Sequence, residues 1–438
     1  MHIPESNLPR IVVVGGGFAG LQFCKRVNKN KFQIVLLDRH NYHTFQPLLY
    51  QVATAGLEPD SIAYPIRKIF EDQRENFFFR IGEAKNIDAE QQILETTSGK
   101  IAYDYLVIAT GSKTNYFGNK VIEENAMPMK TIPQSLNLRS LFLQNFEQTL
   151  LTDSVNEREK LMNFVIVGGG PTGTELVGAI AELKNHVLPN DYPDLDFTKM
   201  NIHLVEAGER LLAGMSETSG KRALKYLQNM GVKVWLKTAV DSYDGEVIKT
   251  NTSKTIPTRF LIWAAGVQGS PIKGIPEEQI QRGNRIAVDE NNKVIYSDNI
   301  FALGDVAMMV TDDYPRGHPM VAQPAIQQGR LLAKNIERLV DGKPLKAFKY
   351  SDKGSMATIG RNRAVAELQG MKFTGLTAWF IWMFVHLMAL VGFRNKAVTF
   401  VNWVFAYVNY DKGARLIIRA FDKKRNLHEE KVPVGTGE

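Results

Sequence analysis

Cysteine is nearly absent from this chain, because Cys24 is the single cysteine among 438 residues. No disulfide can form within the chain, which excludes a disulfide-held fold and fits a reducing compartment. No apolar signal segment occupies residues 1–6, so we expect the body of the protein to face the cytoplasm. The net charge is +7, but no basic run with interleaved aromatic residues occurs, so we expect no nucleic-acid partner.

Glycine, in contrast, is concentrated in two matching turns about 150 residues apart. In each, an apolar strand runs into G-x-G-x-x-G and then into a helical stretch, over residues 11–27 and 163–187. The first glycine allows the tight turn, the second lets backbone N–H groups reach a pyrophosphate, and the third lets helix and strand pack closely. These glycines are Gly15, Gly17 and Gly20 in the first turn and Gly168, Gly170 and Gly173 in the second. One such turn could be purely steric, but two predict two bound dinucleotides.

An acidic residue ends the strand that follows each fingerprint. Asp38 lies about 20 residues past Gly20, the spacing expected of a carboxylate that holds ribose hydroxyls. Glu206 lies about 33 residues past Gly173, and a proline-bearing insert at residues 188–194 accounts for the excess. Either acid could be a solvated strand end, a reading that fits Glu206 better than Asp38. A carboxylate at Glu206 would repel a 2′-phosphate, so we expect NAD(H) rather than NADP(H) at the second site.

Three further strands end in glycine-containing turns, at residues 103–111, 260–267 and 299–305. With these, residues 8–335 resemble the pyridine-nucleotide flavin oxidoreductases of the glutathione-reductase-like superfamily. The resemblance implies FAD at the first fingerprint and NAD(P)H at the second. It also implies that Asp305 holds the ribityl chain of the flavin. Other residues that it places at the cofactors are Pro47, Thr110, Gly111 and Gly266.

The expected fold is α/β, with two Rossmann-like dinucleotide-binding domains and a C-terminal helical membrane-anchoring region. We expect FAD-binding segments at 8–115 and 283–342, because residues 283–298 return the chain to the first domain. The NADH-binding domain would cover 116–282. A change of composition after Gly342 places the membrane-associating region at 343–438.

The lone cysteine also narrows the expected chemistry. Relatives that reduce disulfides or oxidise sulfide use a cysteine pair beside the flavin, and Cys24 has no partner within the chain. NADH peroxidases and many oxidases need a redox cysteine some 20 residues later, where residues 41–47 contain none. We therefore read Cys24 as a buried thiol. Electrons should leave the flavin directly for an external acceptor.

Residues 373–393 form an uncharged apolar run, and an apolar and aromatic segment resumes at 397–410 after Arg394-Asn395-Lys396. The first run is long enough to cross a membrane as a helix, and the second is not. A spanning helix, an in-plane hairpin and a buried dimer interface remain open. We favour two helices on the cytoplasmic leaflet. Basic residues expected at anionic headgroups are Lys412, Arg415, Arg419, Lys423, Lys424 and Arg425.

A nucleotide-binding body that lacks a cysteine pair, with a membrane-directed tail, resembles the type II NADH:quinone oxidoreductases. Residues 41–53 match that family on the FAD side, and residues 322–329 resemble its A-Q-x-A-x-Q-x-G segment. The resemblance places Gln323 and Gln327 at the quinone entrance and Glu175 near the nicotinamide. Without it, the two glutamines would be exposed amides and Glu175 a carboxylate stabilised by the helix dipole. No EF-hand loop occurs, and we expect no metal.

The expected reaction is hydride transfer from NADH to FAD, followed by two-electron reduction of a membrane quinone without proton pumping. Alternatives are a soluble-type NADH oxidase or flavin reductase, or an NADH-sensing flavoprotein that binds a partner. A homodimer is possible, and the identity of the quinone is left open. His386 would share a helix face with Trp382. The resemblance places this helix beside the quinone entrance, facing Gln323 and Gln327. Because histidine titrates near neutral pH, His386 is a candidate for the proton-coupled quinone step.

Overall fold

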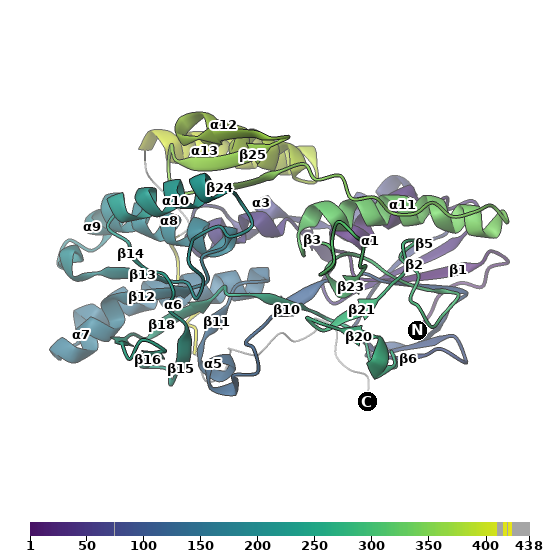
Figure 1. Ribbon diagram of the computed structural model, residues 1–438, viewed down its shortest axis with the longest axis horizontal. Coiled ribbons are helices and arrows are strands. Elements are labelled where there is room, and N and C mark those ends of the chain that lie inside the picture. Colours follow the sequence, from purple (N-terminus) through teal and green to yellow (C-terminus); the bar gives the residue numbers. More distant parts are fainter. Residues whose placement is uncertain (74, 410–414, 418, 423–438) are drawn as a thin grey trace.

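The computed structural model describes residues 1–73, 75–409, 415–417 and 419–422. Two five-stranded sheets form two lobes that lie side by side (Figure 1). The C-terminal helices form a further layer over the lobe that contains the second glycine fingerprint (Figure 1). This arrangement confirms the expected α/β class with a helical C-terminal region.

The first sheet carries the first glycine fingerprint at its centre, and its pairings are all parallel. Its middle strands are buried apolar runs, as expected for a parallel sheet covered on both faces. In spatial order the strands are β22 (Ile300–Ala302), β9 (Tyr105–Ile108), β1 (Arg10–Val14), β2 (Gln33–Asp38) and β5 (Phe77–Ile81). Two helices, α1 (Phe18–Arg26) and α11 (Ala322–Val340), pack together against it.

The second sheet repeats this plan around the second fingerprint, again with parallel pairings. Its strands in spatial order are β11 (Met127–Pro128), β18 (Phe260–Trp263), β12 (Asn163–Val167), β13 (Asn201–Val205) and β14 (Lys233–Trp235). Its larger helices are α6 (Ile132–Leu151), α7 (Val155–Met162), α8 (Pro171–His186) and α10 (Glu217–Asn229). In both sheets, the glycine turn therefore follows the central strand.

Two antiparallel strands link the lobes. β10 (Ser112–Thr114) leaves the first sheet and pairs with β19 (Val267–Gly269), which leaves the second. The chain then returns to the first sheet, where β22 lies beside β9. The two strands that cross between the lobes, β10 and β19, are therefore hydrogen-bonded to each other.

Smaller elements complete the two lobes. The short antiparallel strands are β3 (Tyr42–Thr44), β4 (Ala63–Pro65), β6 (Ala84–Asp88), β7 (Ile93–Thr96), β8 (Gly99–Ala102), β15 (Val240–Tyr243), β16 (Val247–Thr250), β17 (Thr255–Pro257), β20 (Ile280–Gln281), β21 (Arg285–Ala287) and, paired in parallel with β21, β23 (Ala307–Met308). The short helices are α2 (Leu49–Ala53), α3 (Pro59–Ile62), α4 (Ile66–Ile69), α5 (Lys120–Asn125) and α9 (Leu188–Asp191). Single 3-10 turns are η1 (Gln46–Leu48), η2 (Glu71–Gln73), η3 (Phe197–Lys199), η4 (Glu277–Gln279) and η5 (Gly304–Val306).

A three-stranded antiparallel sheet precedes the C-terminal helices, and the sequence pattern did not reveal it. Its strands are β24 (Ser355–Thr358), β25 (Ala364–Leu368) and β26 (Met371–Thr374). Gly178 lets it approach α8, because a Cβ there would lie 2.9 Å from the backbone nitrogen of Gly360. The C-terminal region is thus a mixed sheet-and-helix unit that packs on the second lobe.

The apolar run at 373–393 is not one helix, which corrects the sequence-based expectation. Its first residues belong to β26, α12 covers Gly375–Ala389, and α13 covers Phe393–Asn409. The break lies at Gly392, whose φ of +83° favours glycine and whose Cβ would strike the ring of Tyr64. No described helix is both long and apolar enough to cross a bilayer.

The expected polar interruption instead forms the first turn of α13. Asn395 Nδ2 donates to the carbonyl oxygens of Asp60 and Ala63, at 2.9 and 2.8 Å. The buried hydroxyl of Thr399 donates to the carbonyl of Ser61 at 3.5 Å. These residues fasten α13 to α3 and the segment that follows it, which explains why polar residues interrupt an apolar segment.

Gly329→Ala should separate α1 from α11, because a Cβ at position 329 would collide with the carbonyl oxygen of Ala19. Overpacking of this kind costs about 1–3 kcal/mol. We expect a lower denaturant midpoint in chemical unfolding. Lys334→Ala, an exposed change on the same helix, should leave the midpoint unchanged. An unaltered midpoint for Gly329→Ala would show that the two helices do not depend on this close approach.

Candidate functional site

The first glycine turn has the shape of a dinucleotide cradle. Gly15 adopts φ +108°, and a Cβ there would strike the carbonyl of Ala109 at the end of β9. A Cβ on Gly20 would strike the carbonyl of Gly15, so strand and helix touch at this point. A Cβ on Gly17 would meet nothing within 4 Å. The loop therefore has open space in front of the N-terminus of α1, where a pyrophosphate would bind.

The second turn repeats this geometry. Gly168 adopts φ +113° and lies against the carbonyl of Ala264, which follows β18. A Cβ on Gly173 would strike the carbonyl of Gly168, whereas one on Gly170 would again meet nothing within 4 Å. Because both loops leave the same space free in front of a helix N-terminus, both fit the same part of a dinucleotide.

The two acids occupy equivalent positions beside these loops. Asp38 Oδ2 accepts a hydrogen bond from the backbone N–H of Gly16 at 2.6 Å. Glu206 Oε2 accepts one from Gly169 at 2.5 Å, and its Oε1 accepts one from Gly208. Burial raises the pKa of Asp38, and the backbone hydrogen bonds oppose that shift. Both carboxylates thus lie at the loop, as ribose-binding acids would.

Asp305 lies where the first sheet meets the connection between the lobes. Its Oδ2 accepts a hydrogen bond from the Ser112 hydroxyl at 2.6 Å and lies 4.0 Å from the Lys130 ammonium. Burial lowers the pKa of Lys130. Gln328 Oε1 accepts from the N–H of Gly304 at 2.7 Å. Sequence reasoning missed Ser112, Lys130 and Gln328, since no motif singles them out.

Thr110 and Gly111 mark the same edge of the first sheet. The Thr110 hydroxyl donates to the carbonyl of Ser270 at 2.6 Å, which ties the two crossings together. Gly111 adopts φ +69°, and a Cβ on it would meet nothing within 4 Å. Pro47 is in the turn η1, directly before α2.

Cys24 lies fully buried in α1. Burial raises the pKa of its thiol to about 12. The thiolate is the reactive form of cysteine, so a thiol held in this way is inert at neutral pH. The structure agrees with the reading of Cys24 as a packing residue.

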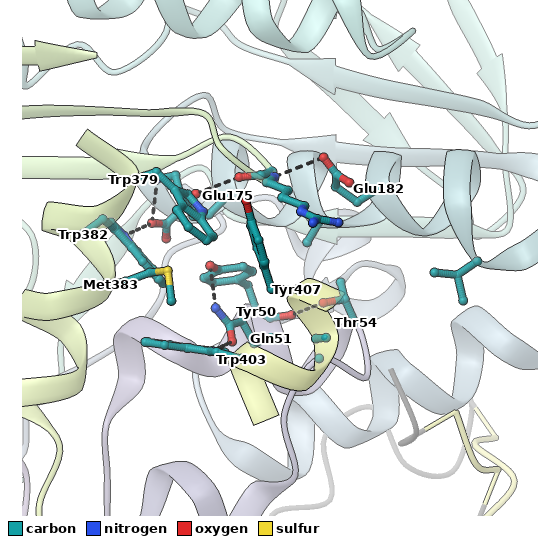
Figure 2. A pocket seen from close by; sticks show the side chains of 17 residues that line it. Tyr50, Gln51, Thr54, Glu175, Glu182, Trp379, Trp382, Met383, Trp403 and Tyr407 are labelled. Carbon is teal, nitrogen blue, oxygen red and sulfur yellow. Dashed lines mark hydrogen bonds between the residues drawn. The ribbon is translucent and has the colours of Figure 1, made fainter. Parts of the chain in front are cut away.

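An aromatic cavity of about 150 Å³ lies between α2, α8, α12 and α13 (Figure 2). Its aromatic lining residues are Tyr50, Trp379, Trp382, Trp403 and Tyr407. Its acidic lining residues are Glu175 and Glu182. A dry cavity of about this volume accommodates one six-membered ring.

Glu175 projects from α8 toward this cavity and is fully buried by its surroundings. Its Oε1 accepts hydrogen bonds from the indole Nε1 of Trp382 at 3.0 Å and from the backbone nitrogen of Thr358 at 3.2 Å. Burial raises the pKa of Glu175 to about 8, although both hydrogen bonds act in the opposite direction. The carboxyl group is therefore protonated at neutral pH.

A second indole fastens α13 to the opposite wall of the cavity. Trp403 Nε1 donates to Gln51 Oε1 at 2.8 Å, and Gln51 Nε2 donates to the hydroxyl oxygen of Tyr50 at 3.0 Å (Figure 2). Burial raises the pKa of Tyr50 well above its ordinary value, and nearby Glu175 raises it further. The indole N–H groups of two tryptophans thus connect the C-terminal helices to the nucleotide-binding body.

His386 stacks on Trp382 with ring centroids 4.1 Å apart, which confirms the predicted shared face. Its Nδ1 hydrogen-bonds the carbonyl of Trp382 at 2.8 Å. Burial lowers the pKa of His386 to about 4, so the expectation of titration near neutral pH is wrong. The ring contacts Phe45 edge-on at 6.1 Å, on the side expected for FAD.

The two predicted glutamines differ in their surroundings. Gln327 exchanges two hydrogen bonds with the backbone of Ser351, at 2.9 and 3.0 Å. Gln323 is half-buried in the first turn of α11. The described contacts of His386 are with Trp382 and Phe45 rather than with either glutamine.

The outer surfaces of α12 and α13 are apolar. Exposed side chains are Leu376, Phe380, Phe384, Val385 and Met388 on α12, and Phe393, Phe400, Val401, Val404, Phe405, Tyr407 and Val408 on α13. Such a surface indicates an interaction site. Of the basic residues expected beside it, Arg415 instead pairs with Asp191, a correction, and Arg419 is exposed. Lys412, Lys423, Lys424 and Arg425 lie outside the described residues.

Comparisons with known proteins identify two family models and several relatives that this chain matches. Residues 9–329 match the pyridine nucleotide-disulphide oxidoreductases, and residues 353–409 match the NDH2 C-terminal domain. The chain is 35% identical over 433 residues to the type II NADH:quinone oxidoreductase Ndh of Mycobacterium tuberculosis, over 95% of this chain and 92% of the relative. It is 31% identical over 392 residues to the type II NADH:quinone oxidoreductase of Haemophilus influenzae, over 82% and 87% of the two chains.

Two solved structures share the fold. The structure of NDH2 from Plasmodium falciparum in complex with NADH superposes with a TM-score of 0.85 at 22% identity, over 94% of this chain and all of that chain (100%). The sulfide:quinone oxidoreductase of Aquifex aeolicus gives a TM-score of 0.70 at 20% identity, over 91% and 95% of the two chains.

Glu175→Gln should change how stability depends on pH. Between the ordinary pKa of 4.5 and the folded-state pKa of about 8, the native protein keeps a proton that the unfolded chain has lost. The free energy of unfolding should therefore fall as pH rises through this window and level off above it. The glutamine variant should lack this decline in urea unfolding from pH 5 to 9. Parallel curves for the two proteins would show that Glu175 is ionised in the native state.

Proposed function

The chain belongs to the pyridine nucleotide-disulphide oxidoreductases and, among them, to the type II NADH:quinone oxidoreductase family, and on this premise we propose that it oxidises NADH and reduces a membrane quinone without pumping protons. Bound FAD would accept a hydride from NADH and pass two electrons to the quinone. One observation carries the proposal. Glu175, on the helix of the second nucleotide cradle, reaches the aromatic cavity under the apolar helices.

The residues around the two cradles support the cofactor assignment. Gly15, Gly17 and Gly20 would hold the FAD pyrophosphate, with Asp38 on the ribose and Asp305 on the ribityl hydroxyls. The equivalent glycines of the second cradle would hold NADH, with Glu206 on its adenosine ribose. Pro47, Thr110, Gly111 and Gly266 would border the cofactors. Both acids accept backbone N–H groups, so each is held at its glycine loop.

We propose that the quinone head group approaches through the aromatic cavity. The cavity fits a single ring and lies beside helices with exposed apolar surfaces. Reduction of a quinone by two electrons consumes two protons. Glu175 is protonated at neutral pH and can supply one of them, whereas His386 is neutral and packs against the indole that binds Glu175. His386 is therefore a positioning residue in this scheme.

Membrane association is proposed on the exposed apolar surfaces of α12 and α13. In-plane helices with large apolar side chains insert into the boundary between headgroups and acyl chains. The body would then face the cytoplasm, as the sequence suggested. A homodimer that buries the same surface is the competing use of these helices. Flotation of the purified protein with lipid vesicles distinguishes membrane association from dimerisation. A protein that binds the membrane floats with the vesicles, whereas a dimer that buries these surfaces does not.

Loss of His386 or Gln323 should slow reoxidation of the flavin by quinone and leave its reduction by NADH unchanged. The alanine variants would be mixed first with NADH and then with a soluble quinone, without oxygen, in a stopped-flow instrument that records flavin absorbance. Val155→Ala, an exposed change on α7, is the control. Normal reoxidation in both variants would place the quinone site elsewhere. A wild-type protein that reacts with oxygen and not with quinone would be a soluble-type oxidase.

Glu206→Gln should weaken the preference for NADH over NADPH. The substitution removes the negative charge that would repel a 2′-phosphate, and it retains a side chain of similar size. Steady-state kinetics with each nucleotide would measure the ratio of kcat/KM values. Asp38→Gln changes the acid of the other cradle and should leave that ratio as it is. An unchanged ratio for Glu206→Gln would assign nucleotide selection to another residue.

A further inference from the structure

Phe117 combines two unfavourable features. Its φ is +54°, in the left-handed region that bulky side chains rarely adopt, and its side chain is 66% exposed. Left-handed backbone at a residue other than glycine costs about 1–2 kcal/mol, and an exposed phenyl ring gains little from burial. Backbone outliers of this kind persist where their surroundings impose them, and they cluster at functional sites.

Asn115 and the second sheet hold Phe117 in this conformation. The N–H of Phe117 donates to Asn115 Oδ1 at 2.8 Å. The backbone of Asn115 is itself bound twice, since its N–H donates to the carbonyl of Gly266 at 3.1 Å and its carbonyl accepts from Trp263 Nε1 at 2.8 Å. The segment that carries Phe117 is therefore attached to the carboxyl end of β18.

The phenyl ring lies against Gly266. A Cβ on that glycine would be 3.0 Å from Phe117 Cζ. The ring also contacts the indole of Trp263, with centroids 6.4 Å apart and planes at 62°. A Cβ at position 266 would require the ring to shift by a few tenths of an ångström, so the ring packs closely on the Gly266 turn.

The strand order identifies which half of a dinucleotide comes to this place. β12, which carries the cradle, lies between β13 and β18. The two nucleoside halves extend from the pyrophosphate in opposite directions. Glu206 directly follows β13 and is the acid proposed for the adenosine ribose, so the nicotinamide half would extend over the end of β18, near Gly266 and Phe117.

We propose that the ring of Phe117 packs against the nicotinamide half of NADH and directs it toward the flavin. The inference rests on the proposed function, because it needs the second cradle to bind NADH. Phe117 lies three residues after the end of β10, which is one of the two strands that cross between the lobes, and three residues before α5 begins. A ring at this point contacts the nucleotide where it passes from one lobe to the other.

The test measures binding of two ligands to the FAD-loaded enzyme by titration calorimetry. NAD⁺ contains the nicotinamide half, and ADP-ribose lacks the nicotinamide ring. Phe117→Ala should weaken NAD⁺ binding by about 2- to 12-fold, the range expected from loss of one aromatic contact. It should leave ADP-ribose binding unchanged. Phe117→Tyr should retain the affinity of the wild-type protein for both ligands.

Phe117→Gly separates the ring from the backbone strain. Glycine adopts a positive φ readily, so this variant should unfold at a temperature at least as high as Phe117→Ala while it loses as much NAD⁺ affinity. Leu151→Ala, an exposed change at the end of α6, is the control. Unchanged NAD⁺ binding in Phe117→Ala, or equal losses for NAD⁺ and ADP-ribose, would overturn the inference. A wild-type enzyme that binds neither ligand would instead overturn the proposed NADH site.

Discussion

The hydrogen bond from the Trp382 indole to Glu175 joins the apolar C-terminal helices to the lobe that carries the second glycine turn. Glu175 belongs to the helix whose N-terminus forms the second nucleotide cradle, and Trp382 belongs to the first apolar C-terminal helix. Leaving either partner buried and unpaired would cost about 1–3 kcal/mol. The position of α12 is therefore tied to that of α8, which follows the second glycine turn. His386 stacks on the same indole, and Trp382 and Glu175 both line the aromatic cavity.

Burial acts in opposite directions on the two titratable groups beside that bond. It raises the pKa of Glu175 to about 8 and lowers that of His386 to about 4. The physical cause is the same in both cases, since burial away from water disfavours the charged form of each group. At neutral pH both groups are uncharged. A cavity with five aromatic side chains in its lining suits an apolar ring that arrives from lipid, and the acid retains a proton that it can release.

The two lobes contain glycine turns of the same geometry. In each turn, a Cβ on the first glycine would strike the carbonyl of a neighbouring strand end, one on the second would meet nothing within 4 Å, and one on the third would strike the carbonyl of the first. Each has an acid that accepts the N–H of the glycine between the first two positions. The residues beside the two glycine turns differ. Asp305 and Lys130 lie beside the first, and Gly266 and Phe117 lie at the end of β18 in the second.

The sequence alone determined the two cradles, their acids and the buried state of Cys24, because glycine spacing and strand ends are local properties of the chain. It also indicated that the apolar C-terminal segments form two helices. Tertiary structure decided what those helices contact. The break between the two C-terminal helices lies at Gly392, where a Cβ would strike the ring of Tyr64. Asn395, which was expected in the break, instead hydrogen-bonds the backbone of α3. Burial raises the pKa of Glu175 in a site completed by residues more than 180 positions away, and desolvation of this kind cannot be read from local sequence.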